Sequence, residues 1–413
     1  MKGFAPEFFK GNRQRLRGVF GDSGPIILTA NGLIQRTRDD DTYEFNQDGS
    51  FWYLCGVDQP NFILVMDKDE DYLIGPELDE RWLAFHGGID LEALAKKSGV
   101  DEALTGKQGW QRLSKRLKKI RHAAVMMPSE AFDERFLVYT NPAKEHLIKK
   151  LKSHNARLKL SDVAGHIAEL RTIKQPSEIE AIQKVIDETM EVYQVIGKKL
   201  DKYKNEQEIS AEIDYLYAKR GLKPSFRQII AGGKNAVTLH YGKNDSQINT
   251  SEILLMDIGA SLSHYCSDLT RSVTLKPTKR QQAVYDAVMQ VRQFALDMLK
   301  PGIRLPEYEG AISGFMGEKL QDLGLIKIID EPSVRKYYPH STSHFLGIDV
   351  HDVGDFKKPL KEGMVITVEP GLYIPEENIG IRIEDDVLIT ESGCRVLSER
   401  LSRELGSLRI LSE

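Results

Sequence analysis

The sequence predicts an α/β (α+β) protein in which a smaller N-terminal mixed domain precedes a larger domain made of two similar halves. Three observations support this prediction. The chain has 413 residues, which exceeds the length at which one hydrophobic core usually stops growing. A polar segment containing a proline interrupts the chain near residue 172. After that segment, the order of two helices followed by strands occurs twice.

The segment 171–177, Arg-Thr-Ile-Lys-Gln-Pro-Ser, is the predicted boundary between the two domains. Ser177 and Glu180 have the spacing of a capping box, which predicts that a helix begins at Ser177. We therefore expect an N-terminal α/β domain over residues 1–172 and a second domain over residues 173–413.

The N-terminal domain is predicted from short apolar runs at 26–28 and 62–66, which alternate with Asp and Gly turns and with helical patterns. Residues 66–160 offer no clear motif, and no catalytic cluster stands out before residue 172. The sequence therefore directs the search for chemistry to the second domain.

The second domain is predicted from helical periodicity, caps and short β-branched runs. Thr278 and Gln281 form a second capping box, and Gly221 is a helix stop. The predicted helices cover residues 177–200, 206–220, 279–300 and 306–323. The predicted strands cover residues 229–230, 236–241, 253–258, 268–275, 365–369 and 380–390. Residue identity does not repeat between the halves, so we interpret them as a structural pseudo-repeat whose sheets close around one site.

Composition excludes several classes of function. The chain is 41% hydrophobic and 29% charged with a net charge of −4, and no separate run of Lys or Arg suggests a nucleic-acid or membrane partner. Its three cysteines are far apart and show no CxxC spacing, which favours a reducing compartment. Basic residues near the N-terminus precede no apolar block, unlike a signal peptide, so we expect a cytoplasmic protein.

Five side chains with metal-binding groups lie in the second domain, in both of its halves. They are Asp257, Asp268, His344, Glu369 and Glu384. Asp257 ends an apolar run at 253–256, where a buried carboxylate is costly unless a cation or hydrogen-bond donors compensate for its charge. Four carboxylates and one imidazole nearly balance two divalent ions, which is typical of a two-metal hydrolytic site.

The spacing of these residues predicts which of them face each other. Asp257 and Asp268 lie 11 residues apart across a turn, so two antiparallel strands would set them side by side. Thr270 shares a strand face with Asp268 and can donate a hydrogen bond to a ligand carboxylate. Alternation also places Arg382 and Glu384 on one face, so Arg382 can orient Glu384 or a substrate carboxylate. Taken alone, Arg382 would fit a surface ion pair equally well.

Histidines are scarce in the chain, which has ten, yet His340, His344 and His351 fall within twelve residues. One imidazole can bind a metal while the others hydrogen-bond a developing oxyanion or transfer protons near neutral pH. His240, which follows a Gly-Gly-Lys-Asn turn, is a fourth candidate, although a hydrogen-bonded core histidine is an equal interpretation of it.

Several motifs together carry a family resemblance. They are Asn-Ala-Val-Thr-Leu-His-Tyr at 235–241, Asp-Ile-Gly-Ala at 257–260, Tyr-Cys-Ser-Asp-Leu-Thr-Arg at 265–271, Ser-His-Phe-Leu-Gly-Ile-Asp-Val-His-Asp-Val-Gly at 343–354, Thr-Val-Glu-Pro-Gly-Leu-Tyr at 367–373 and Gly-Ile-Arg-Ile-Glu-Asp-Asp at 380–386. With them the chain resembles the proline-specific pita-bread metallopeptidases, and aminopeptidase P in particular. The stretches 43–47 and 51–57 extend the resemblance into the N-terminal domain.

The resemblance implies a pita-bread catalytic domain that cuts the bond between an N-terminal residue and a following proline. It implies that the five residues with metal-binding groups hold two divalent ions, with Mn²⁺ expected and Co²⁺ or Zn²⁺ as substitutes, and that a hydroxide bridging the ions attacks the peptide. Four carboxylates and one imidazole also suit Mn²⁺ chemically. The expected partners are proline-containing peptides, and a homo-oligomer, dimer or tetramer, is expected to form through the N-terminal domain, which would also shape the substrate mouth.

The same resemblance implies roles for residues around the metals. Glu369 would accept and relay a proton, and His351 would stabilise the tetrahedral oxyanion. The residues expected to position the substrate and pass protons are His240, His340, Tyr373 and Arg382.

Two other functions share these features. A prolidase has the same metal chemistry but accepts only Xaa-Pro dipeptides. A non-catalytic module of the same fold binds peptides or proteins without cutting them, although the filled ligand positions argue against it. Hydrolysis of Xaa-Pro-Xaa tripeptides would exclude a prolidase. A metal-loaded protein that cuts no Xaa-Pro peptide would favour the non-catalytic module.

Overall fold

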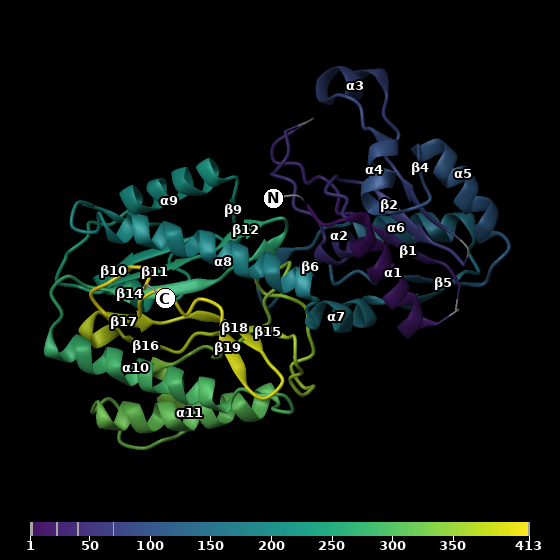
Figure 1. Cartoon of the computed structure of the whole chain (residues 1–413). Coiled ribbons are helices and arrows are strands. Elements are labelled where there is room, and N and C mark those ends of the chain that lie inside the picture. The colour runs from purple at the N-terminus through teal and green to yellow at the C-terminus, as the bar shows by residue number, and fades with distance from the viewer. Residues whose placement is uncertain (1–2, 22–23, 39–40, 69, 412–413) are drawn as a thin grey trace. The chain divides into compact units, whose positions relative to one another are not determined.

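The computed structural model describes residues 3–21, 24–38, 41–68 and 70–411. The chain divides into two compact units, Met1–Arg171 and Thr172–Glu413. Both combine helices with sheets, so the predicted α/β class is confirmed (Figure 1). No helix among the described residues is long and apolar enough to cross a membrane.

The N-terminal unit is built on a six-stranded sheet with the order β4-β3-β2-β1-β5-β8. Strand β2 runs antiparallel to its neighbours β1 and β3, and the other pairs are parallel. The strands are β1 (Ile26–Thr29), β2 (Ile63–Met66), β3 (Asp71–Ile74), β4 (Glu102–Leu104), β5 (His122–Val125) and β8 (Lys159–Asp162), and a separate hairpin joins β6 (Phe132–Asp133) to β7 (Val138–Tyr139). The apolar runs at 26–28 and 62–66 are thus confirmed as β1 and β2.

Helices flank this sheet and fill the stretch that showed no motif. They are α1 (Pro6–Phe20), α2 (Gly49–Cys55), α3 (Glu80–His86), α4 (Leu91–Ser98), α5 (Gly106–Leu117), α6 (Ala143–His154) and α7 (Ala164–Thr172). Leu113 and Leu117 of α5 and Leu147 and Leu151 of α6 pack with the sheet in one buried core. Strands this short, three or four residues each, give little periodicity to recognise in a sequence.

The C-terminal unit contains two sets of helices with strands between them. Helices α8 (Pro176–Gly197) and α9 (Glu206–Arg220) lie on one side of the strands, and α10 (Lys279–Met298) and α11 (Leu305–Asp322) lie on the other (Figure 1). A short helix, α12 (Glu331–Tyr337), follows α11. The four predicted long helices are confirmed, including the Thr278–Gln281 capping box and a left-handed Gly221 after α9.

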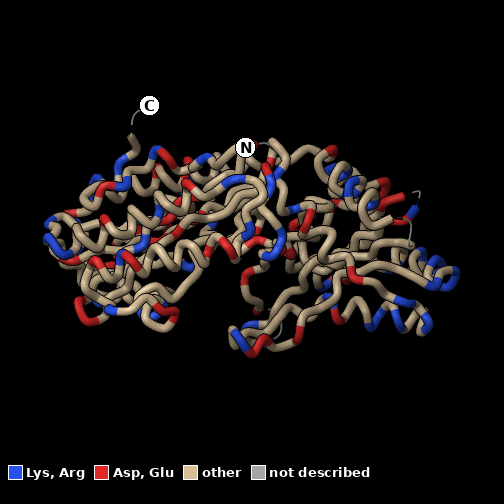
Figure 2. The backbone as a smooth tube through the Cα atoms, turned by 90° about the horizontal axis from the view of Figure 1, so that it is seen from below, with Lys and Arg blue, Asp and Glu red and all other residues tan. Residues whose placement is uncertain are grey.

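The strands of this unit form several small antiparallel sheets. The first half supplies β9 (Lys223–Pro224), β10 (Ile229–Gly232), β11 (Leu254–Ile258), β12 (Ala260–Leu262), β13 (Tyr265–Cys266) and β14 (Leu269–Val273). The second half supplies β15 (Val365–Val368), β16 (Gly371–Ile374), β17 (Ile379–Arg382), β18 (Asp385–Ile389) and β19 (Cys394–Val396). The main core packs α10 and α11 against the second set of strands. Acidic and basic residues are both scattered along the backbone (Figure 2).

Three sequence predictions of elements in this unit are wrong. Helix α8 begins at Pro176 and not at Ser177, because Gln175 and Glu178 form the capping box and proline favours the first helical position. Residues 236–241 form no strand: the 3₁₀ helix η1 (Gly233–Val237) and a turn occupy them. The strand expected at 380–390 is divided into β17 and β18, because the chain exchanges the partner β16 for β15 between them.

Candidate metal centre and active site

The first half of the C-terminal unit contributes two aspartates to one face of a sheet. Strands β11 and β14 pair antiparallel with Asp257 opposite Thr270. Directly opposed residues share a face, and Asp268 shares that face because it precedes Thr270 by two residues. Asp257 and Asp268 are only 7% and 5% exposed, so both carboxylates are withdrawn from water.

The second half brings Glu384 against this face. Glu384 lies between β17 and β18, where its backbone N–H donates to the carbonyl oxygen of Thr270 over 3.1 Å. The Thr270 hydroxyl in turn donates to Glu384 Oε2 over 2.6 Å. This reciprocal contact joins the two halves at the site, and it realises the supporting role expected of Thr270.

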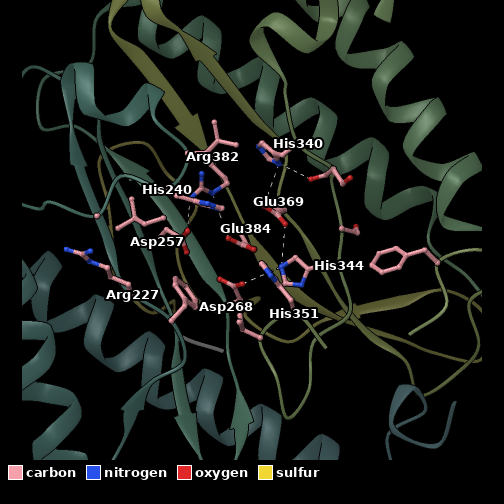
Figure 3. A pocket seen from close by; sticks show the side chains of 18 of the residues that line it. Arg227, His240, Asp257, Asp268, His340, His344, His351, Glu369, Arg382 and Glu384 are labelled. Atoms are coloured by element: carbon pink, nitrogen blue, oxygen red, sulfur yellow. Dashed lines mark hydrogen bonds and ion pairs between the residues drawn. The ribbon is translucent and has the colours of Figure 1, made fainter. Parts of the chain in front are cut away.

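His344 and Glu369 complete the set of carboxylates and imidazole (Figure 3). His344 Nε2 lies 3.5 Å from Asp268 Oδ2 and 3.5 Å from Glu369 Oε1. His344 Nδ1 lies 3.0 Å from the carbonyl oxygen of Phe345, which can only accept, so Nδ1 carries the proton and Nε2 keeps its lone pair. One ligand atom each from Asp268, His344 and Glu384 lies within 4.8 Å of the others.

The charges at this site require compensation, and a metal would supply it. Burial and the neighbouring carboxylates raise the pKa of Asp268, Glu369 and Glu384 well above the usual range. Asp257 Oδ1 is buried and has no hydrogen-bond partner among the described residues. Four carboxylates with one imidazole are ligands for hard or borderline divalent cations, so the residues present fit metal ions.

A series of hydrogen bonds connects Asp257 to His340 through Arg382 and Tyr373. Arg382 Nη2 donates to Asp257 Oδ2 over 2.6 Å, and Nη1 donates to the Tyr373 hydroxyl over 2.9 Å. The Tyr373 hydroxyl lies 2.9 Å from His340 Nε2. Because His340 Nδ1 lies 2.8 Å from the Ser341 carbonyl oxygen and must donate to it, Tyr373 donates to Nε2. Arg382 is therefore bound mainly to Asp257, and it approaches Glu384 only to 4.0 Å.

All four candidate histidines line one pocket of about 710 Å³ with the carboxylates. The rings of His344 and His351 lie 4.4 Å apart, edge to face, and His240 is exposed at the wall. Burial and the neighbouring cationic groups lower the pKa of His340 to about 3, and burial with His344 lowers that of His351 to about 4. Both imidazoles are thus neutral near pH 7, when each ring has one N–H to donate.

The structure adds residues that the motifs did not single out. The pocket wall also includes apolar and aromatic side chains and one arginine: Phe226, Arg227, Ile229, Leu239, Val350 and Phe356. Glu309 of α11 accepts hydrogen bonds from the backbone N–H groups of Thr342 and Ser343, which fixes the chain before His344. The spacing of these residues in the sequence is not typical of any site. Their place at the pocket could be recognised only once the fold brings distant segments of the chain together.

Comparisons with known proteins agree with this geometry. Residues 179–391 match metallopeptidase family M24, and residues 9–126 match the aminopeptidase P N-terminal domain. The human Xaa-Pro aminopeptidase 3 is 33% identical over 96% of this chain and 82% of its own length. The Xaa-Pro aminopeptidase of Escherichia coli (strain K12) is 31% identical over 93% of this chain and 92% of its own.

A solved structure is similar over the whole chain. Aminopeptidase P from E. coli with the inhibitor Pro-Leu has a TM-score of 0.85 and 26% identity, and the match covers 98% of this chain and 97% of that one. The resemblance inferred from the motifs is confirmed. The match to M24 extends over more than half of the 413 residues, so this chain belongs to metallopeptidase family M24.

Proposed function

We propose that this chain is a metal-dependent Xaa-Pro aminopeptidase, which removes an N-terminal residue when proline follows it. The observation that carries the proposal is the convergence of Asp268, His344 and Glu384, whose ligand atoms lie within 4.8 Å of one another in a pocket. The relatives named Xaa-Pro aminopeptidase match nearly the whole chain, including the N-terminal unit.

The proposed metal ligands hold two divalent ions, Mn²⁺ in the cell. They are Asp257, Asp268, His344, Glu369 and Glu384. When bound, such ions polarise the substrate carbonyl and lower the pKa of water towards neutrality. Two observations favour more than one positive charge here. The pKa of three of the carboxylates is raised, and one Asp257 oxygen has no hydrogen-bond partner among the described residues.

The side chains around the ligands then handle protons and orient the peptide. Glu369 accepts the proton of the attacking water, because its carboxylate lies in the pocket, 3.5 Å from His344 Nε2. His351 and His240 donate N–H groups towards the developing oxyanion. Arg382 and Tyr373 hold Asp257 and His340 in place through the hydrogen bonds described above.

Proline suits the apolar part of the pocket wall. An Xaa-Pro amide has no N–H and a rigid ring, so it leaves no donor unsatisfied against Phe226, Leu239 and Phe356. The proline nitrogen must be protonated as it leaves, and His340 and Tyr373 form a hydrogen-bonded pair that can pass that proton.

Peptide hydrolysis after metal removal and reconstitution tests the proposal. Protein stripped with a chelator should be inactive on Xaa-Pro-Xaa tripeptides, and Mn²⁺ should restore turnover, with two ions bound per chain by elemental analysis. Activity on Xaa-Pro dipeptides alone would instead identify a prolidase. A Mn²⁺-loaded protein inert on every Xaa-Pro peptide would support the non-catalytic alternative.

The proposal extends to assembly and location. We expect a dimer or tetramer formed through the N-terminal unit, where Phe136, Leu137 and Tyr139 are 64%, 74% and 85% exposed. This unit would also shape the substrate mouth. Sedimentation-velocity ultracentrifugation should show no monomer at micromolar concentration. The three thiols, none of which forms a disulfide, fit the cytoplasm, which fractionation of the native host would test.

A further inference from the structure

A second charged cluster lies behind the metal centre and contains more arginine than acid. Asp385 is fully buried and accepts from Arg271 Nη2 over 2.7 Å and from Arg292 Nε over 2.6 Å. Arg403 Nη1 approaches the same carboxylate to 3.8 Å. Three guanidinium groups therefore surround one carboxylate. Because Arg403 also pairs with Glu399, three arginines face two acids and one surplus positive charge remains.

Two nitrogens of this cluster have no acceptor. Arg292 Nη2 and Arg403 Nη1 are buried without a hydrogen-bond partner among the described residues. Arg271 differs, because it also donates to the backbone carbonyl oxygens of Thr270, Glu384 and Ser402. A buried charged donor left unpaired is costly, and Arg292 and Arg403 are the two arginines of this cluster with a nitrogen that lacks a hydrogen-bond acceptor in the described part of the chain.

Both of these arginines line a cavity of about 1080 Å³ that shares no lining residue with the metal pocket. The cavity is bounded by α8, the C-terminal part of α10, β19 and the segment 397–403. Arg292 is only 4% exposed, and it is one of the residues that line this cavity.

The wall of this cavity is more basic than acidic. Five cationic residues line it, Arg292, Lys300, Arg395, Arg400 and Arg403, against three acids, Asp187, Asp297 and Glu399. The acids already have partners: Asp187 accepts from Gln183 and Arg400, Asp297 from Gln293, and Glu399 pairs with Arg403. Arg395 and Lys300 form no ion pair within the described part of the chain.

We propose that this cavity binds a small oxyanion of the phosphate class, either free phosphate or the phosphoryl group of a small metabolite. Guanidinium groups match such an anion because their planar N–H donors pair with two of its oxygens at once. Arg395 and Lys300 supply accessible positive charge, and the buried cluster adds surplus charge behind them.

The site is connected to the metal centre through the backbone. Arg271 Nη1 donates to the carbonyl oxygen of Glu384 over 2.6 Å, and Asp385 is the next residue. Arg292 and Arg403 both approach Asp385, so an anion beside them lies close to the residue that follows Glu384 in the chain. The inference does not depend on the peptidase activity, because the binding assay below needs no substrate.

Calorimetric titration of the full-length Mn²⁺-loaded chain with inorganic phosphate tests the proposal. Arg395→Ala removes an exposed cation that pairs with no acid in the described ranges, so the fold is expected to survive. Arg409→Ala is the matched control, because Arg409 is 63% exposed, pairs with Glu404 and lies outside the cavity. Any phosphate bound at the metal ions is the same in all three proteins.

Wild type and Arg409→Ala should bind phosphate with the same affinity in one phase of the titration. Arg395→Ala should weaken this phase about tenfold or more, and Arg395→Lys, which keeps the charge but loses the paired N–H donors, should restore only part of the affinity. Repeating the titration with glycerol phosphate distinguishes the sources, since tighter binding of the ester indicates a metabolite and tighter binding of phosphate indicates the free ion. Equal phosphate affinity in wild type, Arg395→Ala and Arg409→Ala would overturn the proposal, as would an equal response to chloride at matched ionic strength.

Discussion

Glu206 is a buried carboxylate that holds the segment carrying His240. Its Oε1 accepts from the backbone N–H of Gly232 over 2.8 Å and from the side chain of Asn235 over 3.0 Å. Its Oε2 accepts from the Tyr241 hydroxyl over 2.8 Å and from the Ser246 N–H over 2.9 Å. Four hydrogen bonds to one fully buried side chain fix the turn that places His240 at the pocket wall.

Glu206→Gln should therefore reduce kcat/KM for an Xaa-Pro tripeptide by about tenfold. The amide replaces one accepting oxygen with an NH₂ group, which faces N–H or O–H donors and leaves them without an acceptor, at a cost of ~1–3 kcal/mol. The effect should act through His240. In a His240→Ala background the same substitution should cost little further activity, as expected for coupled residues. Independent, multiplicative losses in the double variant would show that Glu206 only stabilises the fold.

A salt bridge in the N-terminal unit predicts a pH dependence of stability. Arg116 Nε and Nη2 donate to the two oxygens of Asp67 over 2.7 and 3.0 Å. Burial is the largest single influence and opposes ionisation of Asp67. The hydrogen bonds from Arg116 and from the Lys68 backbone N–H, together with the charges of Arg116 and Arg17, outweigh burial and lower the pKa of the carboxyl. A lowered pKa in the folded state means that the stabilisation is present above the unfolded pKa of about 4 and is lost as pH falls through the folded value.

Asp67→Asn should lower the free energy of unfolding at pH 7 by up to ~1 kcal/mol, since the pair is partly exposed and screened by solvent. The difference from wild type should shrink as pH falls below about 4. Urea unfolding at several pH values measures it, with Arg116→Gln removing the same pair from the other side. A difference that stays constant with pH would contradict the assignment.

At the scale of elements, helices with local caps were predictable and segments with distant partners were not. The Thr278–Gln281 capping box and Gly221 mark helix ends through contacts within a few residues, and both are where the sequence indicates. The β-branched pattern at 236–241 favours a strand, yet η1 and a turn form there. Glu206, 29 and 35 residues away, accepts hydrogen bonds from the side chains of Asn235 and Tyr241 and so holds this segment in place.

The candidate site divides in the same way. The face shared by Asp257, Asp268 and Thr270 follows from strand alternation and a short turn, and the pairing of β11 with β14 agrees with it. The contact of Arg382 with Asp257 joins residues 125 positions apart, so alternation along one strand could not reveal it. The arginine cluster around Asp385 is likewise assembled from distant segments.

Close packing between η1 and β17 predicts the effect of a single added methyl group. A Cβ atom at Gly380 would lie 2.0 Å from the carbonyl oxygen of Ala236, and backbone cannot move aside as a side chain can. Gly380→Ala should destabilise the protein by ~1–3 kcal/mol.

Gly314→Ala on α11 is the matched control, because a Cβ there meets nothing within 4 Å and alanine is the better helix former by about 1 kcal/mol. Thermal unfolding of both variants should show a lower Tm for the first and an equal or higher Tm for the second. An unchanged Tm for Gly380→Ala would show that η1 tolerates displacement.

At the scale of the whole molecule, the proposed metal centre takes its ligands from both halves of the C-terminal unit. Asp257 and Asp268 come from the first set of strands, and His344, Glu369 and Glu384 follow α11. Ions bound between them should therefore hold the halves together and stabilise the native state, by about 2.7 kcal/mol at a free concentration of 100 times Kd.

Mn²⁺ should accordingly raise the Tm of the chelator-treated wild type, and Asp268→Asn should abolish most of the increase. Asp322→Asn provides the control, because Asp322 is 69% exposed and, among the residues that the structure describes, pairs only with Lys319 on its own helix. An equal Mn²⁺-dependent increase in Tm for all three proteins would place the stabilising ions elsewhere on the molecule.

Anomalous diffraction from crystals of the Mn²⁺-loaded chain, recorded near the manganese edge, tests the proposed centre most directly. The account predicts two strong peaks in the 710 Å³ pocket, contacted between them by Asp257, Asp268, His344, Glu369 and Glu384. A map with no peak in this pocket, or with ions bound by other side chains, would contradict it.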